Sequence, residues 1–318
     1  MAPVIAVVVP CYNEEAVLPE TVKRLSALLL RLSSAGTVDP KSRMILVDDG
    51  SRDQTWPIIE ALAANRHDVE GIKFAHNAGH QNALWAGLMA ARQTVDAAIS
   101  IDADLQDDIE AIPKFIEAFG RGCDIVYGVR SARTADSRFK RVTARRFYAL
   151  MRKMGADVVD DHAEYRLMSR RALDALSEFT ETNLFLRGMV PLLGFTSESV
   201  EYERGERFAG ETKYPFRKML AFALQGITSF SVKPIHWVTL LGILFSLFGI
   251  GIALYVLLSI AFGFAAPGWS SLMISIWIIG GAQLIALGLI GEYIGRIYTE
   301  VKRRPKYIIE SHIRKDGK

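Results

Sequence analysis

The sequence predicts an α/β domain built on a parallel, doubly wound sheet, followed by two helices that span a membrane. Short apolar runs alternate with segments of helical periodicity along the first part of the chain, a pattern typical of parallel sheets. Polar clusters follow four successive apolar runs, and no Asp, Glu, Lys or Arg occurs from residue 234 to residue 291. With 318 residues, half of them hydrophobic, the chain can form both a sizeable core and a membrane segment.

Five short apolar runs are expected to form the strands of the sheet. They are residues 4–9, 44–47, 72–75, 97–101 and 124–127. The helix after the first run is indicated by apolar residues at helical spacing, namely Leu18, Val22, Leu25, Leu29 and Leu32. Because parallel strands end at the same edge, the polar clusters should meet there, where α/β proteins bind ligands. No Gly-x-Gly-x-x-Gly or Walker A loop is present, which disfavours a dinucleotide enzyme and a P-loop ATPase.

The acidic motif Asp102-Ala103-Asp104-Leu105-Gln106 follows the fourth expected strand. In an extended backbone the side chains of Asp102 and Asp104 lie on one side, and Gln106 continues the alternation. Two carboxylates and an amide oxygen form a set of ligands that suits Mg²⁺ or Mn²⁺. An ion held there could neutralise a leaving diphosphate. The alternative is an acidic loop that caps the next helix, since Asp-x-Asp pairs are common in loops.

The uncharged segment near the C-terminus predicts two membrane-spanning helices, at about 235–262 and 271–291, with a Gly- and Pro-containing turn between them. Each reaches the roughly 20 residues that a bilayer requires. A buried helical hairpin of a globular protein is the alternative, and so long a segment without charge disfavours it. The expected organisation is therefore an α/β domain over 1–232, a membrane domain over 233–298 and a basic cytoplasmic tail over 299–318.

The distribution of charge around the apolar helices predicts their orientation. Lys233 precedes the first helix, the turn is uncharged, and a basic group follows the second helix: Arg296, Lys302, Arg303, Arg304 and Lys306. The positive-inside rule then predicts a multi-pass protein of the cytoplasmic (inner) membrane with its large domain and both termini in the cytoplasm. Residues 4–9 are too short and lack the basic flank of a signal peptide. Cys11 and Cys123 suggest neither a metal site nor a disulfide framework.

Two further stretches combine basic and apolar residues in the way of helices that lie in a membrane interface. Residues 138–154 include seven basic residues and no acidic one, interleaved with apolar residues at roughly helical spacing. Residues 214–230 repeat the pattern with Arg217 and Lys218. A nucleic-acid-binding patch and a plain core helix are the alternatives. The membrane anchor disfavours a nucleic-acid partner.

Three motifs follow expected strands: Val9-Pro10-Cys11-Tyr12-Asn13-Glu14-Glu15, Val47-Asp48-Asp49-Gly50-Ser51 and the acidic motif. Together they resemble the motifs of inverting family 2 glycosyltransferases, which have a GT-A (Rossmann-like) fold. The closer resemblance is to polyisoprenyl-phosphate glycosyltransferases, which include bactoprenol glucosyltransferases and dolichol-phosphate mannose synthases. It is carried by Asn77-Ala78-Gly79-His80-Gln81, Tyr127-Gly128-Val129-Arg130, Tyr165-Arg166-Leu167-Met168 and Arg207-Phe208-Ala209-Gly210-Glu211-Thr212-Lys213-Tyr214. The sequence departs from the pattern at His76, where Arg is expected, and at Glu164, where Asp is expected.

The resemblance implies a role for particular residues. The nucleotide-sugar site would be formed by Pro10, Tyr12, Glu14, Asp48, Asp49, Asp102 and Ala103, with Asp48 as a structural neighbour. Mg²⁺ or Mn²⁺ would be held on the donor diphosphate by Asp102, Asp104 and Gln106. The acceptor phosphate and the leaving diphosphate would be bound by Arg130, Arg204, Arg207 and Lys213. The expected catalytic residues are Asp104, Arg130 and Glu164.

Other interpretations of these residues stay open. Tyr12 could pack over the end of a strand. His76 and His80 could form a zinc pair, but no further ligand has suitable spacing, so His80 is expected to cap a helix or to shape the pocket. The basic residues could be solvated surface charges, above all Arg204. Glu164 could be a general base or could orient a cation such as Arg130 or Arg166. We favour orientation, because a phosphate acceptor has a second pKa near 6 and is already ionised.

The function that follows is inverting transfer of a sugar from a nucleotide diphosphate sugar to a polyprenyl phosphate such as undecaprenyl phosphate. Glucose from a UDP-sugar is the first expectation, for modification of a cell-envelope glycan. A transferase that uses GDP-mannose and resembles dolichol-phosphate mannose synthases is one alternative. A processive polysaccharide synthase and a catalytically silent membrane scaffold are the others. The sequence leaves the oligomeric state open, with a homotetramer as one option.

Overall fold

The computed structural model describes residues 2–130, 162–182, 184–203, 205, 233–262 and 268–315. The chain forms two compact units. One unit contains the α/β domain together with the C-terminal residues from Pro305 onwards, and the other contains two long C-terminal helices. The basic amphipathic stretches expected at 138–154 and 214–230 lie outside the described residues.

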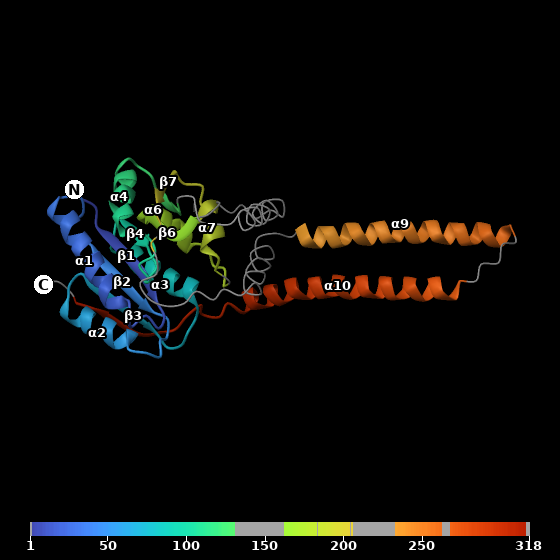
Figure 1. The fold of residues 1–318 in the computed structure, drawn as a ribbon, viewed down its shortest axis with the longest axis horizontal. Coiled ribbons are helices and arrows are strands. Elements are labelled where there is room, and N and C mark those ends of the chain that lie inside the picture. Colours follow the sequence, from blue (N-terminus) through green and yellow to red (C-terminus); the bar gives the residue numbers. More distant parts are fainter. Residues whose placement is uncertain are drawn as a thin grey trace. The chain divides into compact units, whose positions relative to one another are not determined.

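The described residues of the α/β domain form one eight-stranded sheet in the order β7-β5-β6-β4-β1-β2-β3-β8 (Figure 1). Its strands are β1 (Ile5–Cys11), β2 (Arg43–Asp48), β3 (Val69–Phe74), β4 (Ala97–Ser100), β5 (Ile125–Arg130), β6 (His162–Ser169), β7 (Ser197–Tyr202) and β8 (Ile309–Arg314). The α/β class is as expected, and β4, β1, β2 and β3 are parallel. Strand β5 runs in the same direction, since β6 is antiparallel to both β4 and β5, so the five expected strands are parallel as predicted. Among the described strands, β6 and β8 run antiparallel to their neighbours, and neither belongs to the five expected runs.

Helices alternate with the central strands as the apolar periodicity predicts. They are α1 (Leu18–Ser34), α2 (Thr55–Asn65), α3 (His80–Arg92), α4 (Ile112–Gly120), α6 (Arg170–Ser177) and α7 (Leu186–Leu192). The apolar stripe of α1 is buried as expected. Helix α3 packs closely on the sheet at Gly87, where an added Cβ would lie 2.3 Å from Cγ1 of Val8. This close packing fixes the start of α3 near the ends of the central strands.

The register of the central strands brings the polar clusters together. Cys11 at the end of β1 pairs with Asp48 at the end of β2, and Val8 pairs with Ser100 at the end of β4. The segments that follow these three strands therefore leave the sheet at the same edge. This is the edge at which the sequence predicts a ligand site.

Two long helices, α9 (Lys233–Ala261) and α10 (Trp269–Lys302), make up most of the second unit and contact each other. Helix α9 lies close to the expected 235–262, whereas α10 continues about three turns beyond the expected end at 291. Within the described residues, one segment, Ile278–Lys302, is long and apolar enough to cross a membrane, and α9 contains the shorter apolar stretch Trp237–Gly251. Large apolar side chains are exposed along both helices, among them Leu240, Phe248, Leu284 and Leu287.

The segment expected to be a basic tail instead returns to the sheet. Residues 309–314 form β8, which pairs with β3 at the edge of the sheet. Just before it, the ring of Tyr307 stacks on Phe74 with 4.7 Å between centroids, and Lys306 Nζ lies 4.0 Å from the ring centroid of Trp85 in α3. The chain that follows α10 is thus part of the α/β domain.

Candidate active site

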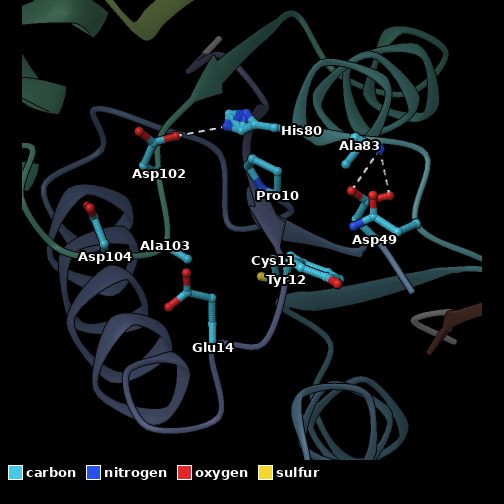
Figure 2. Close-up of a pocket in the computed structure, with 12 residues that line it drawn as sticks. Pro10, Cys11, Tyr12, Glu14, Asp49, His80, Ala83, Asp102, Ala103 and Asp104 are labelled. Atoms are coloured by element: carbon cyan, nitrogen blue, oxygen red, sulfur yellow. Dashed lines mark hydrogen bonds and ion pairs between the residues drawn. The ribbon is translucent and has the colours of Figure 1, made fainter. Parts of the chain in front are cut away.

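A pocket lies at the carboxyl ends of β1, β2 and β4 (Figure 2). It is lined by Pro10, Cys11, Tyr12, Glu14, Asp49, Asn77, Gly79, His80, Ala83, Asp102, Ala103 and Asp104. The structure therefore brings most of the residues expected in the nucleotide-sugar site into one cavity. Asp48 does not line it: it is fully buried and accepts a hydrogen bond from the backbone N–H of Ser51 at 3.3 Å. That is the structural role expected for Asp48.

The turn after β1 is tied to the turn after β2 by hydrogen bonds. The backbone N–H of Asn13 donates to Ser51 Oγ at 2.9 Å, and that of Glu14 donates to Thr55 Oγ1 at 2.8 Å. The neighbouring Tyr12 is 43% exposed although it lines the pocket. Its ring is therefore available for stacking on a ligand and is not buried over the strand end.

Asp49 holds the loop between β3 and α3 against the pocket. Its carboxylate accepts the backbone N–H of Ala78 at 2.7 Å and that of Gly79 at 2.9 Å. Burial raises the pKa of Asp49, and these hydrogen bonds oppose the rise. The next residue, Gly50, has φ +68°, and a Cβ there would lie 2.6 Å from the backbone nitrogen of Asn77. Only glycine allows this approach, so Asp49 and Gly50 together position the loop that carries His80.

The two aspartates of the acidic motif both reach the pocket (Figure 2). Asp102 Oδ1 lies 3.1 Å from Nε2 of His80, the first residue of α3. The pKa of Asp102 is raised to about 6, and burial is the largest cause; His80 opposes the rise, and the carboxylates of Asp107 and Asp104 add to it. Negative charge is therefore concentrated here, and a bound cation would relieve the repulsion.

Gln106 does not continue the alternation that the sequence suggests. Leu105 adopts φ +57°, so the backbone turns after Asp104 and is not extended. Gln106 is absent from the pocket lining, and its carbonyl accepts the backbone N–H of Gly205 at 2.9 Å. In the part of the chain that the structure describes, no group of three or more His, Cys, Asp or Glu side chains is arranged to hold a metal ion. Asp102 and Asp104 fit an ion that takes its other ligands from a bound diphosphate or water.

Glu164 on β6 is the centre of a buried ion-pair cluster. Its carboxylate forms an ion pair with the buried Arg166. It also accepts hydrogen bonds from Nε of Arg187 at 2.9 Å and from Nε2 of Gln81 at 3.1 Å. Burial alone would raise the pKa of Glu164, but Arg166 and Arg187 outweigh this effect and lower the pKa to about 2. A carboxylate held charged in this way is a poor proton acceptor near neutral pH. The geometry thus favours an orienting role for Glu164.

Arg130 belongs to a different cluster from Glu164. Its Nε donates to the Tyr202 hydroxyl at 3.2 Å, and its Nη2 lies 3.4 Å from Asp107 Oδ1. Tyr202 donates to the same oxygen of Asp107 at 2.5 Å. These contacts hold the segment after the acidic motif to β5 and β7. Arg204, Arg207 and Lys213, the other basic residues expected to bind phosphates, lie outside the described residues.

Sequence reasoning missed several members of these clusters. Arg187, Asp107 and Tyr202 belong to no motif quoted above, and Gln81 was noted only as part of one. Their positions depend on pairings between residues 23 to 105 positions apart in the chain. Arg187 lies 23 residues after Glu164, and no motif in the sequence connects the two.

Comparisons with known proteins agree with this geometry. The family model described as glycosyl transferase family 2 matches residues 6–177. The uncharacterized glycosyltransferase YkoT of Bacillus subtilis is 52% identical over 97% of this chain and 91% of its own length. The prophage bactoprenol glucosyl transferase homolog of Escherichia coli is 40% identical over 96% of this chain and 98% of its own. The bactoprenol glucosyl transferase of Shigella phage SfII is also 40% identical, over 96% of this chain and 97% of its own.

Proposed function

Because the chain belongs to glycosyl transferase family 2, we propose that it transfers glucose from a nucleotide diphosphate sugar to a polyprenyl phosphate. The observation that carries the proposal is 40% identity over nearly the whole chain to proteins named bactoprenol glucosyl transferase. The acidic pocket at the ends of β1, β2 and β4 is where the donor would bind. Tyr12 would stack on the base, and Glu14 would lie near the ribose.

The proposed reaction is one displacement at the anomeric carbon. A phosphate oxygen of the acceptor forms a bond to this carbon as the bond to the donor diphosphate breaks, and the electron pair leaves with the nucleoside diphosphate. The configuration inverts. The acceptor oxygen is already anionic at neutral pH, because the second pKa of a phosphate ester is near 6. A strong general base is not required, which agrees with the low pKa of Glu164.

Bringing an anionic acceptor to a diphosphate requires positive charge in the site. Asp102 and Asp104 would hold Mg²⁺ or Mn²⁺, which when bound neutralises charge on the leaving diphosphate. Asp102 and Asp104 line one pocket, and the carboxylates of Asp104 and Asp107 act on Asp102 electrostatically, so a cation at this place would offset concentrated negative charge. His80, in contact with Asp102, would orient that carboxylate.

A panel of nucleotide sugars tests the proposed function. Purified protein in detergent is incubated with undecaprenyl phosphate and with UDP-glucose, UDP-N-acetylglucosamine or GDP-mannose, and lipid products are identified by mass. We expect a single hexose on the lipid, formed fastest from UDP-glucose. Transfer from GDP-mannose alone would favour the dolichol-phosphate mannose synthase alternative. Products with several sugars would favour a processive synthase, and no consumption of any donor would favour a silent scaffold.

We also propose that α9 and α10 cross the cytoplasmic membrane as a pair, with the α/β domain on the inner side. Apolar side chains are exposed along both helices, and basic residues lie at the start of α9 and at the end of α10. Both observations support this topology. In a Cys123→Ser background, a cysteine at Ser270 should react with an impermeant maleimide on intact cells. A cysteine at the exposed Lys41 should react only after lysis. The reverse labelling pattern would contradict the topology.

A further inference from the structure

Arg187, near the start of α7, has a guanidinium group that is bound on one side and exposed to solvent on the other. Its Nε donates to Glu164 Oε1 at 2.9 Å, and its side chain is 32% exposed. Among the described residues, Glu164 is the acidic side chain that forms an ion pair with it. The guanidinium is therefore held in one orientation without being enclosed.

The cluster around Arg187 carries an excess of positive charge. Glu164 contributes one negative charge, whereas Arg166 and Arg187 contribute two positive charges. Arg166 is 2% exposed and also donates through Nη1 to the carbonyl of Leu186 at 3.3 Å. Of the two arginines in this cluster, Arg187 is thus the one at which a ligand can reach the uncompensated charge, as far as the described residues show.

This cation lies beside the pocket. Gln81 Nε2 donates to the same oxygen of Glu164 as Arg187 does, and Gln81 Oε1 accepts the backbone N–H of Leu186 at 3.0 Å. Gln81 directly follows His80, which lines the pocket and contacts Asp102. The acidic pocket and the cationic cluster are therefore neighbours joined through the first turn of α3.

We propose that Arg187 binds the phosphate monoester of the acceptor; this inference rests on the proposed function. With Nε bound to Glu164, the two terminal nitrogens remain as a planar pair of donors, which matches two oxygens of a phosphate. Glu164 then acts as a positioning residue that sets the direction of this pair. The acidic pocket takes the donor and its cation, and Arg187 brings the anionic nucleophile to the edge of that pocket.

The proposal predicts a specific loss of acceptor binding in Arg187→Gln. The full chain is assayed in detergent with UDP-glucose and undecaprenyl phosphate as substrates. We expect the KM for undecaprenyl phosphate to rise roughly tenfold to a hundredfold, because hydrogen bonds from a charged donor are lost. The KM for the donor should change by less than about twofold. Arg187→Lys should restore part of the acceptor affinity. Arg121→Gln, which removes an exposed arginine paired with Glu117 and Glu198, is the matched control and should change neither constant.

Three outcomes would overturn the assignment. A rise in the KM for the donor alone would place the donor diphosphate at Arg187. A lower melting temperature with both KM values unchanged would make Arg187 purely structural. A wild-type protein that transfers no sugar to undecaprenyl phosphate would overturn both the assignment and the proposed function.

A measurement on the unmutated protein keeps the proposal testable if the variants do not fold. Modification of Arg187 by phenylglyoxal, followed by mass spectrometry, should be slowed by undecaprenyl phosphate and not by undecaprenol. If the rate of modification were the same with both lipids, in a protein that still transfers sugar, the assignment of Arg187 would be refuted and the proposed function would stand.

Discussion

Replacement of Asp104 by alanine is expected to abolish sugar transfer in a protein that still folds and inserts into the membrane. Asp104 lies in the pocket beside Asp102, on a loop that leaves the sheet after β4. If the two carboxylates hold a divalent cation on the donor diphosphate, loss of one removes charge stabilisation from the transition state. A loss of about 4 kcal/mol corresponds to roughly a thousandfold lower kcat. The measurement is the initial rate with saturating donor and acceptor.

Two matched variants separate charge from local structure. Asp104→Asn keeps an oxygen that can accept the Gln106 N–H, as Asp104 does at 3.1 Å, but it removes the charge. It should be as inactive as the alanine variant. Asp108→Ala removes the exposed carboxylate that accepts the Glu110 N–H at 2.9 Å, at a cost of about 1 kcal/mol, and should keep its activity. Full wild-type activity in EDTA would contradict the metal assignment.

The pocket could be predicted from the sequence because its residues follow strands whose ends are in register. Tyr12, Asp49 and Asp102 each come just after a central strand, and parallel pairing of β1 with β2 and β4 brings them to one edge. Only the order of apolar runs and polar clusters was needed for this step. The site at that edge is therefore encoded locally, strand by strand.

The parts that the sequence did not predict depend on pairings between distant segments. Strand β8 forms because its residues pair with β3, which lies more than 200 residues earlier in the chain. His312 Nε2 in β8 lies 2.7 Å from Oε1 of the buried Glu70, 242 residues earlier. A short edge strand with two isoleucines among polar and charged residues is not distinguished from a charged tail by composition. Likewise, whether Arg130 or Arg187 pairs with Glu164 depends on where β6 and α7 lie. Gln106 was assigned to the metal site on an extended backbone, which the turn at Leu105 replaces.

Replacement of Glu164 by glutamine should lower activity by a factor that does not depend on pH between 7 and 9. Glutamine keeps the size and the hydrogen-bonding capacity of the side chain, but it loses the charge that holds Arg166 and Arg187. A misplaced Arg187 would cost roughly a hundredfold in rate. If Glu164 were instead the general base, the defect should shrink as the pH rises and the acceptor becomes fully dianionic without help. A defect that disappears at pH 9 in a folded protein would contradict the orienting role.

The same substitution should lower stability, because it leaves Arg166 buried without its counter-charge. Removing one partner of a buried ion pair costs about 3–5 kcal/mol. The folded pKa of Glu164, about 2, lies below the ordinary value of 4.5. The stability from this shift is therefore present above pH 4.5 and is lost as the pH falls from 4.5 towards 2, about 3 kcal/mol in all. Melting temperatures in detergent should show wild type and Glu164→Gln converging over this range. Glu164→Asp keeps the charge, so at neutral pH it should keep most of the stability that wild type has over Glu164→Gln. If Glu164→Asp were only as stable as Glu164→Gln, the length of the side chain, and not its charge, would hold the cluster.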